Sequence, residues 1–407
     1  MKIYDRWLEG ELTGKTSKNK IKLLFGARQT GKSTIIKKIA PADALFINLQ
    51  ERTERLLFER NKDELIKRLG AIKVPKTVII DEIQKVPSLL EDIQLVYDRN
   101  SGDFNFILSG SSARKLHTAA LNLLPGRSHQ FRLFPVILAE MEKRQNFEIL
   151  PLPWKINLKT RFRHPHIEEL LIYGALPGIL LENPESKVKT LETYSELYLE
   201  EEIRREALVR NVGHFSSFLE LSAVESGNIM NLTNLSHQTG IPISTLKIYY
   251  QILVDTFVGF WIFPFIHNLR KRVSKTPKFY FFDTGVRNAL SRIPMQKNIL
   301  KIQAGQLFEQ WVVSELYNRC LYLGKEYRLY YWKTVTGVEV DAILSTPEGI
   351  IPIEIKWTQS PAKSDIKSLE IFLTTFGRIA QKGYLICRCP HKLQLSEKIT
   401  AVPWEMI

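Results

Sequence analysis

The strongest constraint on the fold is a short glycine-containing stretch near the N-terminus, Gly26-Ala-Arg-Gln-Thr-Gly31-Lys32-Ser33. It follows the apolar run 21–25 and leads into segment 33–40, whose apolar residues keep helical spacing until Pro41 interrupts them. Strand, loop and helix in this order direct backbone N–H groups and the positive end of a helix at one point. The sequence therefore predicts a phosphate-binding loop within an α/β fold.

The side chains of this loop indicate ATP with Mg²⁺ as the ligand. Lys32 is expected to contact the β- and γ-phosphates as a catalytic residue, and the Ser33 hydroxyl to bind Mg²⁺. The apolar run 77–80 ends in Asp81 and Glu82, and ligands of open α/β sheets gather at the carboxyl ends of strands. We expect Asp81 to organise the metal and Glu82 to act as general base toward water. Contacts to ATP are predicted for Gly26, Ala27, Arg28, Gln29, Thr30, Gly31, Lys32, Ser33, Thr34, Asp81 and Ser109.

Two downstream segments offer further catalytic groups. Ser109 follows the apolar run 104–108 and is placed to sense the γ-phosphate or to orient the water. Arg127 follows the turn 124–126 and is a candidate arginine finger toward the nucleotide of a neighbouring subunit in a homo-oligomer. Arg114 competes for that role, and an ordinary surface or salt-bridge role stays open for both arginines.

Short apolar runs at 44–49, 77–80 and 104–108 alternate with helical patterns. Such alternation predicts a parallel sheet that is covered on both faces. After segment 131–136 the pattern becomes mostly helical up to Asn211.

Three helical patterns, 215–226, 231–238 and 244–253, precede an aromatic segment, 257–282. This order predicts a helix-turn-helix with a wing, in which Gly240 permits the turn and Ser244 caps the second helix. Thr245 and Lys247 would then begin a helix that enters the major groove of DNA, although the same fold often binds proteins instead. Positive charge in the wing suits a phosphate backbone, with a solvated hairpin tip as the alternative reading. Its members are Arg270, Lys271, Arg272, Lys275 and Lys278.

A second constellation lies near the C-terminus, where Asp341 precedes the triplet Glu354-Ile-Lys356. Because strand side chains alternate, Glu354 and Lys356 share one face while Ile353 and Ile355 turn into the core. Asp341 and Glu354 would bind a second Mg²⁺ or Mn²⁺, and Lys356 would activate water or offset phosphate charge. Glu309, on the preceding helix, is an auxiliary ligand. These residues predict metal-dependent phosphodiester cleavage, and an inert module with internal ion pairs remains the alternative.

Composition limits the partners and the location. Lys and Arg outnumber Asp and Glu by 57 to 43, a formal charge of +14, which makes nucleic acid, most plausibly DNA, or an anionic membrane surface a suitable partner. The 3 cysteines are too few for a disulfide framework or a four-ligand zinc site. No apolar run is long enough for a transmembrane segment, so we expect a cytoplasmic protein.

The chain resembles the bacterial and archaeal AAA-type ATPases that carry a C-terminal restriction-endonuclease-like domain of unknown function. The matching stretches are the phosphate loop, 81–84, 109–111, 124–127, Tyr173-Gly-Ala-Leu-Pro-Gly178, Phe281-Phe-Asp283-Thr-Gly285 and the C-terminal acidic cluster. The resemblance implies an AAA-like core and ATP turnover. Together with the patterns along the chain, it predicts a P-loop core at 1–150, a helical lid or linker at 151–212, a winged-helix-like domain at 213–295 and a restriction-endonuclease-like α/β domain at 296–407.

These features together predict a Mg²⁺-dependent ATPase coupled to a nuclease-like domain that acts on nucleic acid. The alternative is a regulatory NTPase switch whose C-terminal domains bind a protein partner and cleave nothing.

Overall fold

The computed structural model describes residues 4–14, 19–74, 76–99, 102–112, 124–141, 166–205, 211–266 and 276–407. It divides into two compact units, which are described separately. The N-terminal unit comprises Asp5–Phe134 with Asp255–Phe257, and the C-terminal unit comprises Met1–Tyr4, Pro135–Val254 and Val258–Ile407. The finer division of the chain at 150, 212 and 295 stays a prediction.

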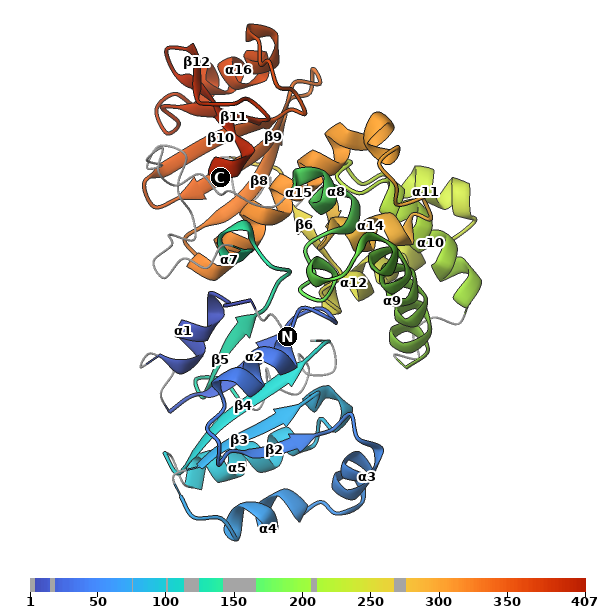
Figure 1. The fold of residues 1–407 in the computed structure, drawn as a ribbon, viewed down its shortest axis with the longest axis vertical. Coiled ribbons are helices and arrows are strands. Elements are labelled where there is room, and N and C mark those ends of the chain that lie inside the picture. Colours follow the sequence, from blue (N-terminus) through green and yellow to red (C-terminus); the bar gives the residue numbers. More distant parts are fainter. Residues whose placement is uncertain are drawn as a thin grey trace. The chain divides into compact units, whose positions relative to one another are not determined.

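A five-stranded parallel sheet forms the centre of the N-terminal unit, in the order β2-β3-β4-β1-β5 (Figure 1). Its strands are β1 (Ile21–Phe25), β2 (Leu45–Asn48), β3 (Lys76–Asp81), β4 (Phe104–Gly110) and β5 (Ser128–Arg132). The α/β fold with a parallel sheet is confirmed.

Helices flank this sheet on both sides. They are α1 (Leu8–Thr13), α2 (Lys32–Ile39), α3 (Arg52–Arg60), α4 (Glu64–Gly70) and α5 (Leu89–Arg99), with a 3₁₀ turn at Ile83–Lys85. Every residue of β1 is buried, and successive strand residues point to opposite faces, so both faces must be covered. On one face Ile21 and Leu23 join a core that includes Leu65 of α4 and Ile93 of α5.

The strand order places the polar strand ends beside one another. β1 leads into the phosphate loop, β3 ends at Asp81, and β4 ends in Ser109 and Gly110. Since β3, β4 and β1 are neighbours and parallel, their carboxyl ends meet at one edge of the sheet. The site is built there.

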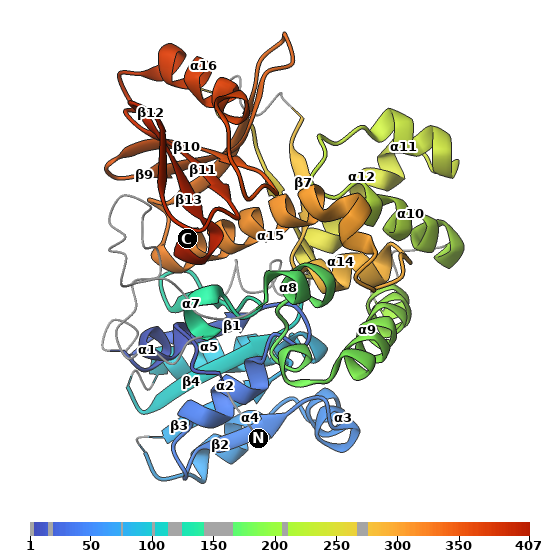
Figure 2. The ribbon, with the colours of Figure 1, turned by 45° about the horizontal axis from the view of Figure 1, so that its top comes forward.

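The C-terminal unit begins with a series of helices and one antiparallel hairpin (Figure 2). The helices are α7 (Leu138–Met141), α8 (Ile167–Tyr173), α9 (Pro184–Arg205), α10 (Val212–Val224), α11 (Leu232–Thr239), α12 (Ile243–Asp255) and α14 (Thr284–Leu290), with a 3₁₀ turn at Ile179–Leu181. The hairpin pairs β6 (Gly259–Ile262) with β7 (Lys278–Phe281). Gly240 has a φ of 69° and ends α11, as a turn there requires.

The predicted cap of the second helix is wrong by two positions. α12 begins at Ile243, after Pro242, so Ser244 lies in its first turn. Pro242 favours a helix start at this point, because its fixed φ suits the beginning of a helix and it has no N–H to leave unpaired. Tyr249 and Tyr250 are buried against Phe218.

A six-stranded mixed sheet completes the unit, in the order β12-β13-β11-β10-β9-β8. Its strands are β8 (Arg328–Lys333), β9 (Glu339–Thr346), β10 (Gly349–Ile355), β11 (Gly383–Cys387), β12 (Leu393–Ser396) and β13 (Ile399–Pro403), accompanied by α15 (Ile299–Leu323), α16 (Lys367–Phe376) and 3₁₀ turns at Lys363–Ile366 and Trp404–Met406. β8 to β10 form an antiparallel meander, and β10, β11 and β13 are parallel. Within the described part of the chain, no helix is both long and apolar enough to span a membrane.

The glycine motifs at 173–178 and 281–285 meet where α8 ends and α14 begins. Asp283 accepts hydrogen bonds from the N–H groups of Ala175 (2.7 Å) and Val286 (3.0 Å). A Cβ on Gly285 would lie 2.1 Å from the carbonyl oxygen of Tyr173. Both motifs are therefore explained by close backbone packing within the C-terminal unit.

Candidate nucleotide site and C-terminal acidic site

The phosphate loop depends on glycine at two positions. A Cβ on Gly26 would lie 2.4 Å from the carbonyl oxygen of Leu133, which leaves no room for a larger residue. Gly31 has a φ of 95° directly before α2, a conformation that costs glycine little. Ala27 and Thr30 are buried, Arg28 is half-buried, and Gln29 and Thr34 are exposed.

The polar groups of the loop and of the two neighbouring strands converge as predicted. The Lys32 ammonium donates to the carbonyl oxygens of Gly26 (2.8 Å) and Ala27 (2.9 Å). The Ser33 hydroxyl donates to Oδ2 of Asp81 at 2.7 Å, and Ser109 donates to Oδ1 of the same carboxylate. A hydroxyl and a carboxylate so close together are the oxygen donors that suit Mg²⁺, and the lysine lies in the loop that would hold the phosphates. The residues present therefore fit MgATP.

Glu82 adopts a left-handed backbone conformation, with φ 61° and ψ 46°. Such a conformation is uncommon for glutamate and tends to occur at functional sites. Oε2 of Glu82 accepts hydrogen bonds from the amide of Gln84 and from Ser111 (3.0 Å). Gln84 also donates to the Ser111 hydroxyl at 3.0 Å. Gln84 and Ser111 lie in the stretches 81–84 and 109–111 that carry the family resemblance, but no contact with Glu82 was predicted for either.

Arg127 lies at the other end of the sheet. The Ile21 N–H donates to its carbonyl oxygen at 3.0 Å, so Arg127 stands at the amino end of β1, whereas the phosphate loop follows the carboxyl end. Its guanidinium contacts Asp98 at 2.6 and 2.9 Å, and this arginine lowers the pKa of the Asp98 carboxyl. Within its own chain Arg127 is therefore remote from the phosphate loop. Arg114 lies outside the described residues.

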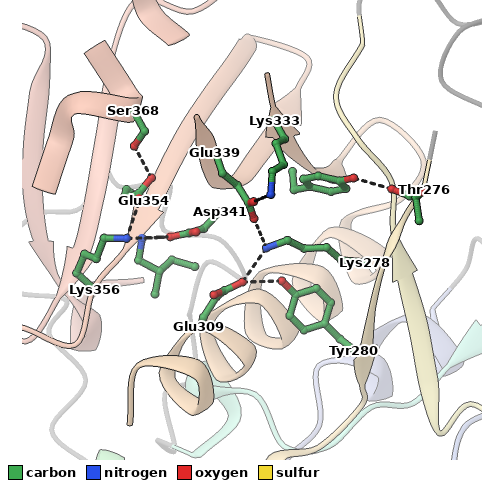
Figure 3. A network of polar contacts seen from close by, with 12 residues as sticks. Thr276, Lys278, Tyr280, Glu309, Lys333, Glu339, Asp341, Glu354, Lys356 and Ser368 are labelled. Atoms are coloured by element: carbon green, nitrogen blue, oxygen red, sulfur yellow. Dashed lines mark hydrogen bonds and ion pairs between the residues drawn. The ribbon is translucent and has the colours of Figure 1, made fainter. Parts of the chain in front are cut away.

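The C-terminal constellation assembles on neighbouring strands (Figure 3). β9 and β10 pair Ala342 with Ile353, so the next cross-strand positions are Asp341 and Glu354. The Lys356 ammonium lies 2.6 Å from Oε1 of Glu354 and 4.0 Å from Oδ2 of Asp341. Ile353 and Ile355 are buried, as the alternation predicted.

Burial governs the charges of this cluster. It raises the pKa of Asp341 well above the usual value, and the carboxylates of Glu309 and Glu354 raise it further. It raises the pKa of Glu354 as well, although Lys356 opposes the shift. Burial alone would lower the pKa of Lys356, but Asp341 and Glu354 outweigh it and the pKa rises. Because the pKa values of both Asp341 and Glu354 are raised, the positive charge of Lys356 does not fully offset the cost of ionising the two carboxyls.

Glu309 and Lys278 both lie beside the cluster. Oε1 of Glu309 accepts hydrogen bonds from Lys278 (3.1 Å) and Tyr280 (2.8 Å), and the role of Glu309 as an auxiliary metal ligand stays a prediction. Within the described residues, no three His, Cys, Asp or Glu side chains are grouped to hold a metal ion. Lys278 is not a surface charge of the wing: only 4% of its side chain is exposed, and it also contacts Glu339 at 2.7 Å.

The remaining basic residues of the wing, Arg270, Lys271, Arg272 and Lys275, lie outside the described part of the chain. On α12, Lys247 is exposed and Thr245 is half-buried.

Residues 18–142 match the family model described as an AAA domain. The N-terminal part is thus an AAA-type P-loop ATPase domain. Residues 164–297 and 304–407 match two models described as domains of unknown function, DUF8612 and DUF4143.

Two similar proteins are described as uncharacterized proteins. Rv2008c of Mycobacterium tuberculosis is 22% identical over 393 residues, covering 95% of this chain and 80% of the relative. MJ1544 of Methanocaldococcus jannaschii is 25% identical over 364 residues, covering 86% and 78%. Among solved structures, the Walker-type ATPase paby2304 of Pyrococcus abyssi has a TM-score of 0.46 and 16% identity, covering 71% of this chain and 96% of that one. A likeness of that degree assigns no function.

Proposed function

We propose that the chain hydrolyses ATP with Mg²⁺, using Glu82 as general base. The observation that supports this most is the convergence of Ser33, Asp81 and Ser109 beside Lys32 at the carboxyl edge of the sheet. When bound, Mg²⁺ would supply positive charge that offsets the charge of the phosphates. Ser33 and Asp81 would hold the hydrated ion, while Lys32 exchanges the loop carbonyls for phosphate oxygens.

Glu82 has one oxygen for support and one for catalysis. Gln84 and Ser111 both donate to Oε2, which fixes the carboxylate, and Oε1 is then the oxygen that would accept a proton from the attacking water. The left-handed backbone at Glu82 turns the side chain at the end of β3. Strain of this kind persists when surrounding contacts over-determine the geometry.

Phosphate release from MgATP tests this proposal. Lys32→Ala should abolish tight nucleotide binding, whereas Glu82→Gln should retain binding and lose turnover by about 100-fold or more, the range of general-base catalysis. Lys38→Ala is the control, because Lys38 lies on the same helix but pairs with the exposed Asp5. Unchanged affinity and turnover in Lys32→Ala would refute the proposed site.

Arg127 remains a candidate finger between subunits. Its side chain is about one-third exposed, at 32%, and its partner Asp98 is 41% exposed. A pair this exposed contributes little to stability, so a neighbour's phosphates could compete with Asp98 for the guanidinium. Specific activity should then rise with protein concentration in the wild type and stay flat in Arg127→Ala.

We also propose that the C-terminal cluster acts on nucleic-acid phosphodiesters. The supporting observation is the cross-strand pair of Asp341 and Glu354 with Lys356 at 2.6 Å from one of them. Two carboxylates suffice for Mg²⁺ or Mn²⁺, since these ions usually keep several waters and take substrate phosphate oxygens as further ligands. Lys356 would orient the water or offset charge on the scissile phosphate. The exposed Lys247 on α12 would support binding to the phosphate backbone.

Incubating the full chain with DNA or RNA, Mg²⁺ or Mn²⁺, and each nucleotide state tests the second proposal. Cleavage should be lost in Asp341→Asn and kept in Glu397→Gln, which changes an exposed acid in the turn between β12 and β13 of the same domain. Absence of cleavage in every state, with Asp341→Asn behaving as wild type, would favour a regulatory NTPase whose C-terminal unit binds a protein partner.

A further inference from the structure

Arg6 reaches the phosphate loop from the start of the chain. One nitrogen of its guanidinium, Nη1, donates to the carbonyl oxygen of Thr30 at 2.8 Å, and the other, Nη2, donates to that of Phe134 at 2.6 Å. Only 7% of Arg6 is exposed. The side chain thus joins the loop to the backbone that follows β5, within the N-terminal unit.

These contacts need the fork of an arginine. The two carbonyl oxygens belong to segments 104 residues apart, and two separate nitrogens of one rigid group reach them. A lysine has a single nitrogen at the end of its chain and cannot reproduce this geometry. A buried cation requires hydrogen-bond partners, so the two carbonyls are held firmly in place.

The contact with Thr30 fixes the direction of the next peptide group. In a trans peptide the C=O and the following N–H point in opposite directions. Because the Thr30 carbonyl points to Arg6, the Gly31 N–H is directed away from Arg6. Backbone N–H groups of a phosphate loop are its anion-binding groups.

We propose that Arg6 is a positioning residue for nucleotide binding: it holds the Thr30–Gly31 peptide in the orientation that presents an N–H to the phosphates. The inference deepens the proposed ATPase function and rests on it. In this role Arg6 contacts neither ATP nor the attacking water. It acts through the loop backbone, and its positive charge adds to the potential that attracts phosphate.

The same segment offers a matched control. Asp5 and Glu9, on either side of Arg6, contact Lys38 of α2 at 2.6 and 2.7 Å. Lys38→Ala removes these exposed ion pairs and leaves the Arg6 guanidinium in place. A general loosening of the N-terminal segment should therefore appear in Lys38→Ala, whereas an effect on the loop should not.

The test measures the affinity of the full chain for a fluorescent ATP analogue with Mg²⁺, together with kcat, KM and thermal unfolding without nucleotide. Arg6→Ala should weaken binding about tenfold or more, as expected when hydrogen bonds to a charged group are lost. Arg6→Lys should be intermediate, and Lys38→Ala should bind as wild type. Guanidinium at millimolar, non-denaturing concentrations should restore part of the affinity of Arg6→Ala and leave wild type unchanged.

Wild-type affinity in folded Arg6→Ala and Arg6→Lys would overturn the inference. Unfolding of both variants without nucleotide would also overturn it, because arginine would then be required for the fold rather than for the loop. Since the readout is affinity, a wild-type chain that binds ATP without hydrolysing it would refute the proposed hydrolysis and not this inference. A wild-type chain that binds no nucleotide would refute both.

Discussion

Replacing Asp283 by asparagine should change how the stability of the C-terminal unit depends on pH. Asp283 is fully buried, and burial raises the pKa of its carboxyl from 3.8 to about 6 even though backbone N–H groups donate to it. The folded state therefore holds a proton that the unfolded state releases between these two values. Stability from this group is complete below pH 3.8 and is lost as pH rises through about 6.

The size of the effect follows from the two pKa values. A change from 3.8 to about 6 corresponds to about 3 kcal/mol at roughly 1.4 kcal/mol per pH unit. Asparagine is neutral at every pH and keeps one oxygen acceptor, so the variant loses part of the hydrogen bonding to Ala175 and Val286 by a constant amount. The difference in the free energy of unfolding between the variant and the wild type therefore changes with pH only through the titration of Asp283.

Denaturant unfolding from pH 4 to 7 measures this difference. The free energy of unfolding of Asp283→Asn, relative to wild type, should rise by about 3 kcal/mol across the range. Other buried carboxyls, such as Asp341, contribute equally to both proteins and cancel. Parallel curves for the two proteins would refute the reasoning, because they would mean that Asp283 binds the same number of protons in both states.

Three further predictions concern contacts within one or the other of the two units. Gln84→Ala should leave ATP affinity unchanged and lower kcat about tenfold, since Glu82 loses one of its two donors; equal turnover would argue against a supporting role. Gly285→Ala should destabilise the fold, because its Cβ would lie 2.1 Å from the Tyr173 carbonyl oxygen, whereas Gly305→Ala, with nothing within 4 Å, should not. Lys278→Met should cost about 3–5 kcal/mol in denaturant unfolding by leaving Glu309 and Glu339 without their buried partner. Its control Lys333→Met, which removes a 39% exposed lysine from Glu339, should cost about 1 kcal/mol or less.

Local periodicity was sufficient to predict the strands that carry the residues of both sites. The apolar runs that end in Gly26, Asp81 and Ser109 are strands of one parallel sheet, so their ends had to meet once the strand order was right. The alternation around Glu354 likewise predicted which side chains face Lys356. In both cases the information lies within a few residues of the chain.

Contacts between distant segments were beyond such reasoning. Its basic sequence neighbours predict that Lys278 belongs to a basic wing, but its partners Glu309 and Glu339 lie 31 and 61 residues further on. Arg6 belongs to none of the predicted motifs, and its contact with Phe134 spans 128 residues. Only the tertiary fold decides whether such a charge faces water or another part of the chain.

The formal charge of +14 is therefore a weak guide to a polyanionic partner. Lys278 and Lys333 share Glu339, and Lys356 contacts Glu354, so these three lysines offset carboxylates of the C-terminal unit. Counterion release depends on the lysines and arginines that reach phosphates, and an ion-paired lysine must first lose its carboxylate. An exposed residue such as Lys247 has no such requirement among the ion pairs of the described residues. The steepness of any salt dependence in nucleic-acid binding would thus report the exposed basic residues and not the total charge.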